Sequence, residues 1–251
     1  MILCIDCGNS RLKWGLHDGR HWLEQGSRAQ NEIARLPRLF AGLPLPERAI
    51  ACNVASDAVR AEVEAALTRL APGRPLVWIA SRAEQCGVKN TYDDPAQLGA
   101  DRWAALIGAR HVHPGPCLVV NAGTATTIDV LTADGIFLGG LILPGITLMR
   151  TALSRATARL PLATGAFSSL PRNTADAIAS GALQATAGAI VRMFARVADS
   201  PGAICLLSGG AAEPLEALLG NHAPCAPEGI PLRRVDNLVL EGLKQLAGMS
   251  A

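Results

Sequence analysis

The sequence lacks a basic region, a membrane-length apolar run and the common signatures of nucleotide-binding loops. Its 251 residues include 23 basic and 21 acidic ones, and the longest basic cluster is the pair Arg233-Arg234. Because nucleic-acid binding needs a basic stripe, direct binding to DNA or RNA is not expected. The most apolar stretch, residues 136–146, is too short for a membrane span and contains both glycine and proline.

The amino terminus and the cysteines indicate the compartment. Residues 1–6 have no basic region and include Asp6, which argues against a secretory signal and favours a soluble, cytoplasmic protein. Seven cysteines suit a reduced compartment better than a disulfide framework. Cys4 and Cys7 form a C-x-x-C, but positions three apart in a strand point to opposite faces. Buried or incidental thiols are therefore favoured over a zinc or redox site.

The missing nucleotide signatures restrict the possible enzymes. The sequence contains no G-x-x-x-x-G-K-[ST], no G-x-G-x-x-G, and no H-R-D or D-F-G pattern. These motifs mark P-loop enzymes, dinucleotide-binding proteins and protein kinases. A chain that handles ATP without them must bind the phosphates on another scaffold.

What the sequence does contain is an internal repeat. Residues 3–16 read LCIDCGNSRLKWGL and residues 118–131 read LVVNAGTATTIDVL, and an Asp-Gly turn follows each block. An alignment without a gap places Asp6 on Asn121, Gly8 on Gly123, Asn9 on Thr124 and Ser10 on Ala125. Both blocks predict a strand, a tight polar turn and a returning strand. We expect a duplicated fold with lobes 1–115 and 116–251 and an active-site cleft between them, although two chance hairpins are an alternative.

The rest of the chain alternates between helical and extended patterns. The Pro114-Gly115-Pro116 cluster marks the expected lobe boundary. The spacing of apolar residues predicts helices over 57–70, 100–112, 174–197 and 238–246, a further helix opened by Pro214, strands over 76–80 and 204–207, and a polar loop over 85–98.

The two predicted turns offer a way to bind phosphate. Backbone N–H groups and the side chains of Asn9 and Ser10 would form a concave set of donors. Asp6, at the strand end, is placed to hold Mg²⁺ that bridges the phosphates, and Lys13 would add a positive charge. Thr124, in the second turn, would contribute from the other lobe. Either turn alone is usually only a turn, and their pairing is what indicates a phosphate site.

Four motifs resemble those of one family. They are Asp6-x-Gly8-Asn9-Ser10-x-x-Lys13-Trp14, Gly99-Ala100-Asp101-Arg102, Gly123-Thr124 and Arg172-Asn173-Thr174, and together they are similar to the type III pantothenate kinases. The resemblance implies an α/β fold of the actin/Hsp70/sugar-kinase-like superfamily, with duplicated ribonuclease-H-like lobes. It also implies ATP-dependent phosphorylation of pantothenate to 4′-phosphopantothenate, the first step of coenzyme A synthesis, usually by a homodimer.

The resemblance implies roles for individual residues. Asp101 would be the general base that accepts the hydroxyl proton, and Arg102 would pair with the pantothenate carboxylate or the transferring phosphoryl group. The residues expected to bind substrate are Tyr92, Gly99, Ala100, Asp101, Arg102 and Thr174. Those expected to bind ATP are Asp6, Cys7, Gly8, Asn9, Ser10, Arg11, Leu12, Lys13 and Thr124, with Ser208-Gly209-Gly210 near the adenosine.

Ordinary structural roles are the alternatives. Asp101 and Arg102 also suit the first turn of a helix, and Thr or Asn before the helix at 174 is a common N-cap. One departure concerns Asn121, where family members commonly have an Asp associated with a monovalent cation such as K⁺ or NH₄⁺. Other functions that stay open are an accessory factor in transcriptional control and a kinase of a sugar or of acetate.

Overall fold

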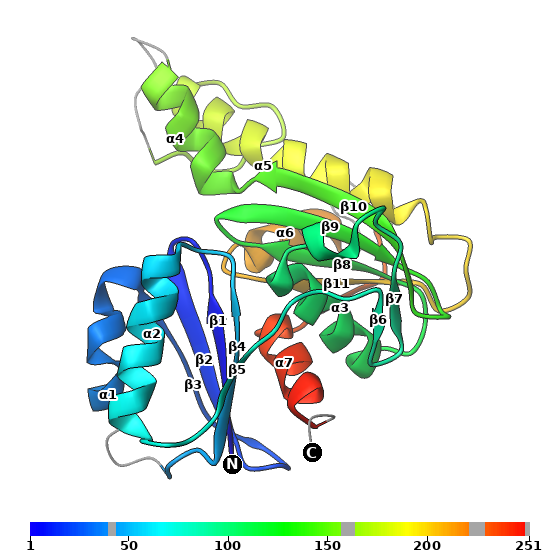
Figure 1. Ribbon diagram of the computed structural model, residues 1–251. Helices are drawn as coiled ribbons and strands as arrows, with labels where there is room; N and C mark the ends of the chain where they lie inside the picture. Colours follow the sequence, from blue (N-terminus) through cyan, green and yellow to red (C-terminus); the bar gives the residue numbers. More distant parts are fainter. Residues whose placement is uncertain (40–43, 157–163, 221–228, 249–251) are drawn as a thin grey trace. The chain divides into compact units, whose positions relative to one another are not determined.

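The computed structural model describes residues 1–39, 44–156, 164–220 and 229–248 (Figure 1). The chain divides into two compact units. Unit 1 comprises Met1–Val112 and Asn237–Ala251, and unit 2 comprises His113–Asp236. Each unit is an α/β structure built on a mixed sheet.

The sheet of unit 1 has five strands in the order β3-β2-β1-β4-β5. They are β1 (Ile2–Cys7), β2 (Arg11–His17), β3 (Trp22–Ala29), β4 (Arg48–Asn53) and β5 (Leu76–Trp78). β1 is antiparallel to β2 and parallel to β4. β1 is apolar at almost every position because both of its faces are covered.

Helices cover both faces of this sheet. On one face, η1 (Gln30–Arg35), α1 (Leu36–Leu39) and α2 (Asp57–Leu70) enclose a core that includes Leu3, Ile5 and Val63. α2 begins where Ser56 accepts a hydrogen bond from Val59 N, as an N-cap should. α3 (Ala100–Val112) and α7 (Leu238–Gly248) contact each other, and both contact β4.

α3 and α7 approach closely because glycine lies at the crossing point. A side chain at Gly108 would collide with the backbone of Leu238, and one at Gly242 would collide with the backbone of Ala104. Polar contacts hold the outer face of α7, where Trp22 Nε1 donates to Glu241 Oε1 at 2.6 Å. α7 is therefore fixed to both α3 and the β2–β3 hairpin.

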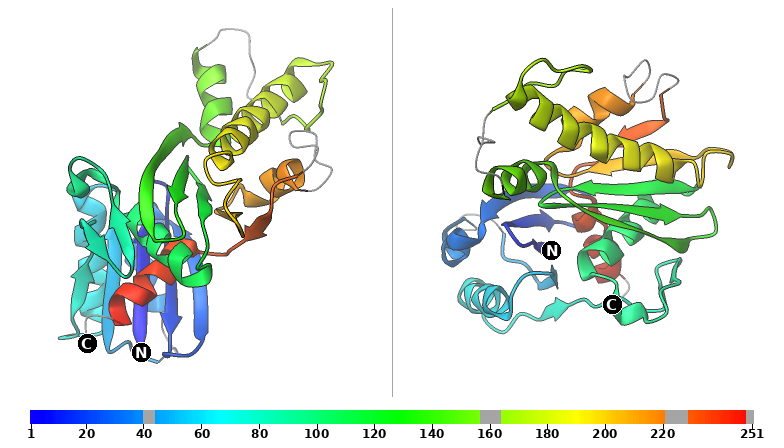
Figure 2. Two further views of the ribbon diagram at one scale, coloured as in Figure 1. Left: turned by 90° about the vertical axis from the view of Figure 1, so that its right-hand side faces the viewer. Right: turned by 90° about the horizontal axis from the view of Figure 1, so that it is seen from above.

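The sheet strands of unit 2 repeat the order and directions of unit 1. β8 (Cys117–Ala122) is antiparallel to β9 (Ala125–Leu131), which is antiparallel to β10 (Ile136–Pro144); β8 is parallel to β11 (Ile204–Ser208), which is parallel to β12 (Leu232–Arg234). Figure 2 shows α5 (Thr174–Phe194) lying across this sheet, and with α6 (Ala212–Leu219) it buries the apolar face. α4 (Ile146–Ala156) packs against α5.

The shared strand order confirms the duplicated fold, but the alignment without a gap is wrong after the turn. In unit 1, Cys7 pairs with Leu12 around Gly8, Asn9, Ser10 and Arg11. In unit 2, Ala122 pairs with Thr126, so this hairpin is one residue shorter. Ser10 consequently has no counterpart, since Ala125 begins the returning strand.

The C-terminal segment differs from the expected lobe 116–251. In chain order, α7 comes after β12, the last strand of the second repeat, just as α3 comes after β5 in the first repeat. By this order α7 is the last helix of the second repeat. Its contacts nevertheless lie with α3, β1 and β4, and residues 237–251 therefore belong to unit 1.

Most other elements agree with the sequence predictions. Helices 57–70 and 100–112 have the predicted bounds, whereas α5 ends at Phe194 and α6 begins at Ala212, before Pro214. The predicted loop 85–98 contains part of the short hairpin of β6 (Glu84–Gln85) and β7 (Val88–Asn90) and a 3-10 turn, η2 (Pro95–Gln97). Among the described helices, α5 alone has the length and composition to cross a membrane, yet it buries Ala187, Ile190 and Phe194 in the core of unit 2.

Candidate active site

Asp6 lies near the end of β1 with its carboxyl almost fully buried, 7% of the residue being exposed. Its cross-strand neighbours are Lys13 on β2 and Cys52 on β4. Burial raises the pKa of Asp6 to about 6, Lys13 opposes that shift, and the nearby Asp101 adds to it. A buried carboxyl with a shifted pKa, next to Lys13 and a second acid, is a candidate for a functional site.

The turn after Asp6 is exposed at its tip and held at its base. Asn9 and Ser10 are exposed, while Gly8 N donates to Arg11 O at 3.1 Å. Gln30, from η1, donates its side-chain amide to Gly8 O at 2.7 Å. The turn therefore presents polar groups to solvent on a fixed backbone.

Asp101 occupies the first turn of α3, the helix predicted to carry the general base. Its Oδ1 accepts a hydrogen bond from Arg102 N at 2.8 Å. Burial is the largest effect on this carboxyl and raises its pKa. A Cβ at Gly99 would lie 2.8 Å from Asp101 Oδ1, so glycine leaves the space that the carboxylate occupies.

Arg102 and Tyr92 form a pair beside this acid. The Arg102 side chain is buried, and one of its guanidinium nitrogens donates to Tyr92 Oη at 2.9 Å. The guanidinium carbon also lies 5.7 Å from the centre of the Tyr92 ring. Two residues ten apart in sequence thus present a cation and a phenol together, which suits recognition of a carboxylate.

The predicted residues in unit 2 lie at the ends of β8 and β11. Asn121 is half-buried and is the register partner of Ser208, which is buried. Gly209 has a φ of +102°, and a side chain there would collide with the backbone of Ala122. Thr124 is exposed in the β8–β9 turn, and its carbonyl accepts from Gly145 N at 2.9 Å.

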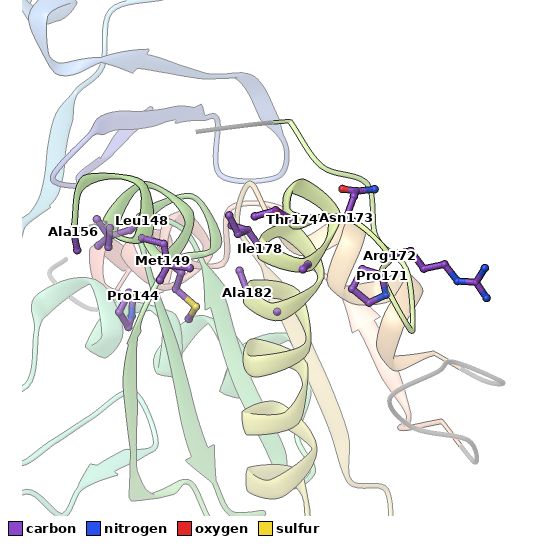
Figure 3. A pocket seen from close by; sticks show the side chains of 14 residues that line it. Pro144, Leu148, Met149, Ala156, Pro171, Arg172, Asn173, Thr174, Ile178 and Ala182 are labelled. Carbon is purple, nitrogen blue, oxygen red and sulfur yellow. The ribbon is translucent and has the colours of Figure 1, made fainter. Parts of the chain in front are cut away.

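Thr174 is the first residue of α5, and Asn173 is the N-cap, since Asn173 Oδ1 accepts from Asp176 N at 2.9 Å. Thr174 is exposed and lines an open cavity of about 1280 Å³ between α4 and α5 (Figure 3). The other walls are mainly apolar and include Leu148, Met149 and Ile178. The capping role therefore falls to Asn173, and the Thr174 hydroxyl is not needed for it.

Unit 1 thus brings together Asp6, Lys13, Tyr92, Asp101 and Arg102, which the sequence predicts as site residues. Asn121, Thr124 and Thr174 lie in unit 2. Two further residues, Gln30 and Cys52, are not predicted by any sequence motif; Gln30 contacts the turn and Cys52 contacts the carboxyl of Asp6. Their roles depend on strand register and on a loop contact, and neither is visible as a sequence motif.

Asp6 fits a magnesium ion that is bound mainly by a nucleotide. Mg²⁺ prefers oxygen ligands and usually takes one or two carboxylates together with phosphate oxygens and water. In the described part of the chain, no three His, Cys, Asp or Glu side chains cluster as a metal site. A single buried carboxyl next to an exposed turn matches a site in which one carboxylate and the nucleotide phosphates bind Mg²⁺ together.

Comparison with known proteins identifies the family. Residues 2–196 match the family model described as type III pantothenate kinase. A type III pantothenate kinase from Aromatoleum aromaticum is 55% identical over 247 residues, which is 98% of each chain. Another from Dechloromonas aromatica is 48% identical over 250 residues, or 98% of this chain and 99% of that one.

Solved structures share the fold at low sequence identity. A Campylobacter jejuni protein described as a Baf family transcriptional activator has a TM-score of 0.60 at 20% identity and covers 99% of this chain and 98% of its own. A Sinorhizobium meliloti protein described as a 2-dehydro-3-deoxygalactonokinase has a TM-score of 0.56 at 15% identity, covering 99% and 96%. The actin/Hsp70/sugar-kinase-like fold that the family resemblance implied is confirmed. By its family model and its close relatives, the chain belongs to the type III pantothenate kinases.

Proposed function

We infer that this protein is an ATP-dependent pantothenate kinase, which makes 4′-phosphopantothenate in the first step of coenzyme A synthesis. The relatives' shared description supports the activity. The observation that carries the chemistry is the half-buried Asp101 carboxyl, which lies next to the Arg102–Tyr92 pair and whose charge adds to the raised pKa of Asp6. An accessory role in transcription, or a sugar or acetate substrate, is not favoured by these relatives.

The reaction requires a base, and Asp101 is proposed for this role. As the hydroxyl oxygen of pantothenate bonds to the γ-phosphorus of ATP, its proton passes to Asp101 and ADP leaves. Burial raises the pKa of Asp101, which makes the carboxylate a better proton acceptor than an exposed one. Arg102, supported by Tyr92, would pair with the pantothenate carboxylate, while Gly99 and Ala100 let the substrate approach the start of α3.

The nucleotide is proposed to bind through the two turns. Gly8, Asn9, Ser10 and Lys13 would contact phosphates in unit 1, and Thr124 is proposed for the same task in unit 2. Cys7 and Leu12 have fully buried side chains, so they can contribute only backbone groups, and Arg11 is exposed beside Ser27. The residues proposed near the adenosine are Ser208, Gly209 and Gly210.

Asp6 is proposed to hold Mg²⁺, which supplies positive charge to the phosphates when the nucleotide is bound. Asn121 offers one neutral amide oxygen, a poorer ligand for K⁺ or NH₄⁺ than a carboxylate. We therefore propose that any monovalent cation at this position is bound weakly.

We also propose that the protein is a homodimer and that it is soluble and cytoplasmic. α4 has no buried residue and exposes Leu148 and Leu153, which supports a second copy covering the cavity that Thr174 lines. Thr174 is proposed to contact substrate there.

The activity is tested by coupled assay of the purified protein with Mg-ATP and pantothenate, with hexoses and acetate in parallel. We expect Asp101→Asn to lower kcat by about 10³-fold, because the base is lost while the shape is kept. Asp134→Asn is the control, as Asp134 lies in an exposed turn. Full activity of Asp101→Asn at unchanged melting temperature would show that another group is the base.

A further inference from the structure

The side chain of Cys52 is fully buried near the C-terminal end of β4, and no sequence motif predicts a role for it. Its parallel register partner is Asp6, so both side chains leave the sheet on the same face. Cys52 Sγ lies 3.5 Å from Asp6 Oδ1 as a hydrogen-bond donor. The contact joins a buried thiol to the carboxyl proposed to hold Mg²⁺.

The two strands that flank β1 give Asp6 two different neighbours. Lys13, on β2, supplies positive charge, and Cys52, on β4, supplies a neutral donor. A side-chain carboxyl turns about two torsion angles, and a donor on one side with a positive charge on the other restricts that rotation. A carboxylate can accept about four hydrogen bonds. One hydrogen bond from the Cys52 thiol therefore orients the carboxylate and leaves the other acceptor positions for a cation.

We propose that Cys52 is a positioning residue that holds the Asp6 carboxyl in the orientation needed for the Mg–nucleotide complex. The inference rests on the proposed function, because it assigns Cys52 a part in the same site. Cys52 itself touches no substrate. It acts only through Asp6 Oδ1.

Cys4 provides a matched control. It is fully buried and lies two residues before Asp6 in β1, so it is on the same face of the sheet as Cys52. No hydrogen bond joins Cys4 to Asp6 among the described contacts. Replacing Cys4 therefore removes a buried thiol of equal size without removing a donor to the carboxyl.

The test compares Cys52→Ala, Cys52→Ser and Cys4→Ala by calorimetric titration with a non-hydrolysable ATP analogue, with Mg²⁺ and again with a chelator. Loss of the donor in Cys52→Ala should weaken the Mg²⁺-dependent affinity about tenfold, since hydrogen bonds to charged groups contribute that much. Cys52→Ser keeps a donor and should stay within about threefold of wild type. Binding without Mg²⁺ and the KM for pantothenate should be equal in all three.

Equal Mg²⁺-dependent affinity of Cys52→Ala and Cys4→Ala would overturn the proposal, as would a Cys52→Ser variant as weak as Cys52→Ala. Cys52→Val, which fills the space without a donor, replaces Cys52→Ala if the smaller side chain prevents folding. Asp6→Asn separates the two possible failures. If Asp6→Asn loses Mg²⁺-dependent binding and Cys52→Ala does not, only the role of Cys52 is wrong; if Asp6→Asn keeps it, the metal role of Asp6 is wrong as well.

Discussion

Units 1 and 2 are built on the same five-strand arrangement, yet they differ in the charge that they carry at equivalent positions. At the end of the first strand, unit 1 has Asp6 flanked by Lys13 and Cys52. In unit 2, Asn121 stands in place of the acid, with Thr127 and Ser208 as its neighbours. At this position the duplicated scaffold is therefore neutral in one copy and charged in the other.

The same asymmetry extends to the helix that follows each sheet. α3 carries Asp101 in its first turn, with a raised pKa. α7 carries Glu241 in its first turn, but there Trp22 and Lys244 both donate to the carboxylate. Both oxygens of Glu241 accept side-chain hydrogen bonds, which suits a packing role, whereas Asp101 Oδ1 accepts a backbone N–H. We therefore expect substitutions in the first repeat to have larger effects on catalysis than their counterparts in the second repeat.

After Asp101→Asn, the largest effect is expected from Gly99→Ala. The new Cβ would lie 2.8 Å from Asp101 Oδ1, so the carboxylate must rotate away. Because a displaced base loses its alignment with the reacting hydroxyl, kcat should fall about 100-fold with little change in melting temperature. Gly188→Ala is the control, because no atom lies within 4 Å of a Cβ there. A Gly99→Ala enzyme with wild-type kcat would mean that Asp101 is not the base.

Lys13→Met and Thr127→Val compare equivalent positions directly. Loss of the Lys13 charge should reduce kcat/KM for Mg-ATP by about 30-fold, in the range for a charged hydrogen-bonding partner. Thr127→Val should change it less than about threefold. Steady-state kinetics at two salt concentrations would check the electrostatic origin, and equal losses in the two variants would contradict the asymmetry.

Asp6→Asn makes unit 1 resemble unit 2 and should affect stability as well as activity. The pKa of Asp6 is about 6 in the folded protein against an ordinary 3.8, so the folded state favours the protonated acid. The protonated carboxyl's contribution to the free energy of unfolding is complete below about pH 4, and it is lost as the pH rises through 6. Without ligand at pH 7, Asp6→Asn should therefore be more stable by on the order of 2 kcal/mol. Urea unfolding at pH 4, 5, 6 and 7 measures this, and a constant difference across those values would be contrary to expectation.

The sequence predicted the repeat and the helices because their signals are local. The Asp6 and Asn121 turns share a pattern, and the alternation rule separated Cys7, which lies in the core cluster, from Cys4, which does not. The shorter turn of unit 2 was missed because one residue does not change the apolar pattern of short strands. Cys52 and Gln30 were missed since their contacts depend on which strands are neighbours, and that is set by the whole fold.

The smallest effect is expected at the base of the Gly8 turn, where the units again differ. In unit 1 a side chain, Gln30, donates to Gly8 O, whereas in unit 2 a backbone group, Gly145 N, donates to Thr124 O. Only the first can be removed by substitution, and Gln30→Ala should raise the KM for ATP about fivefold, because a mobile turn must be ordered on binding. Gln25→Ala, at the β3 contact with Asn237, is the control. Equal KM values for the two variants would show that the turn holds its shape without Gln30.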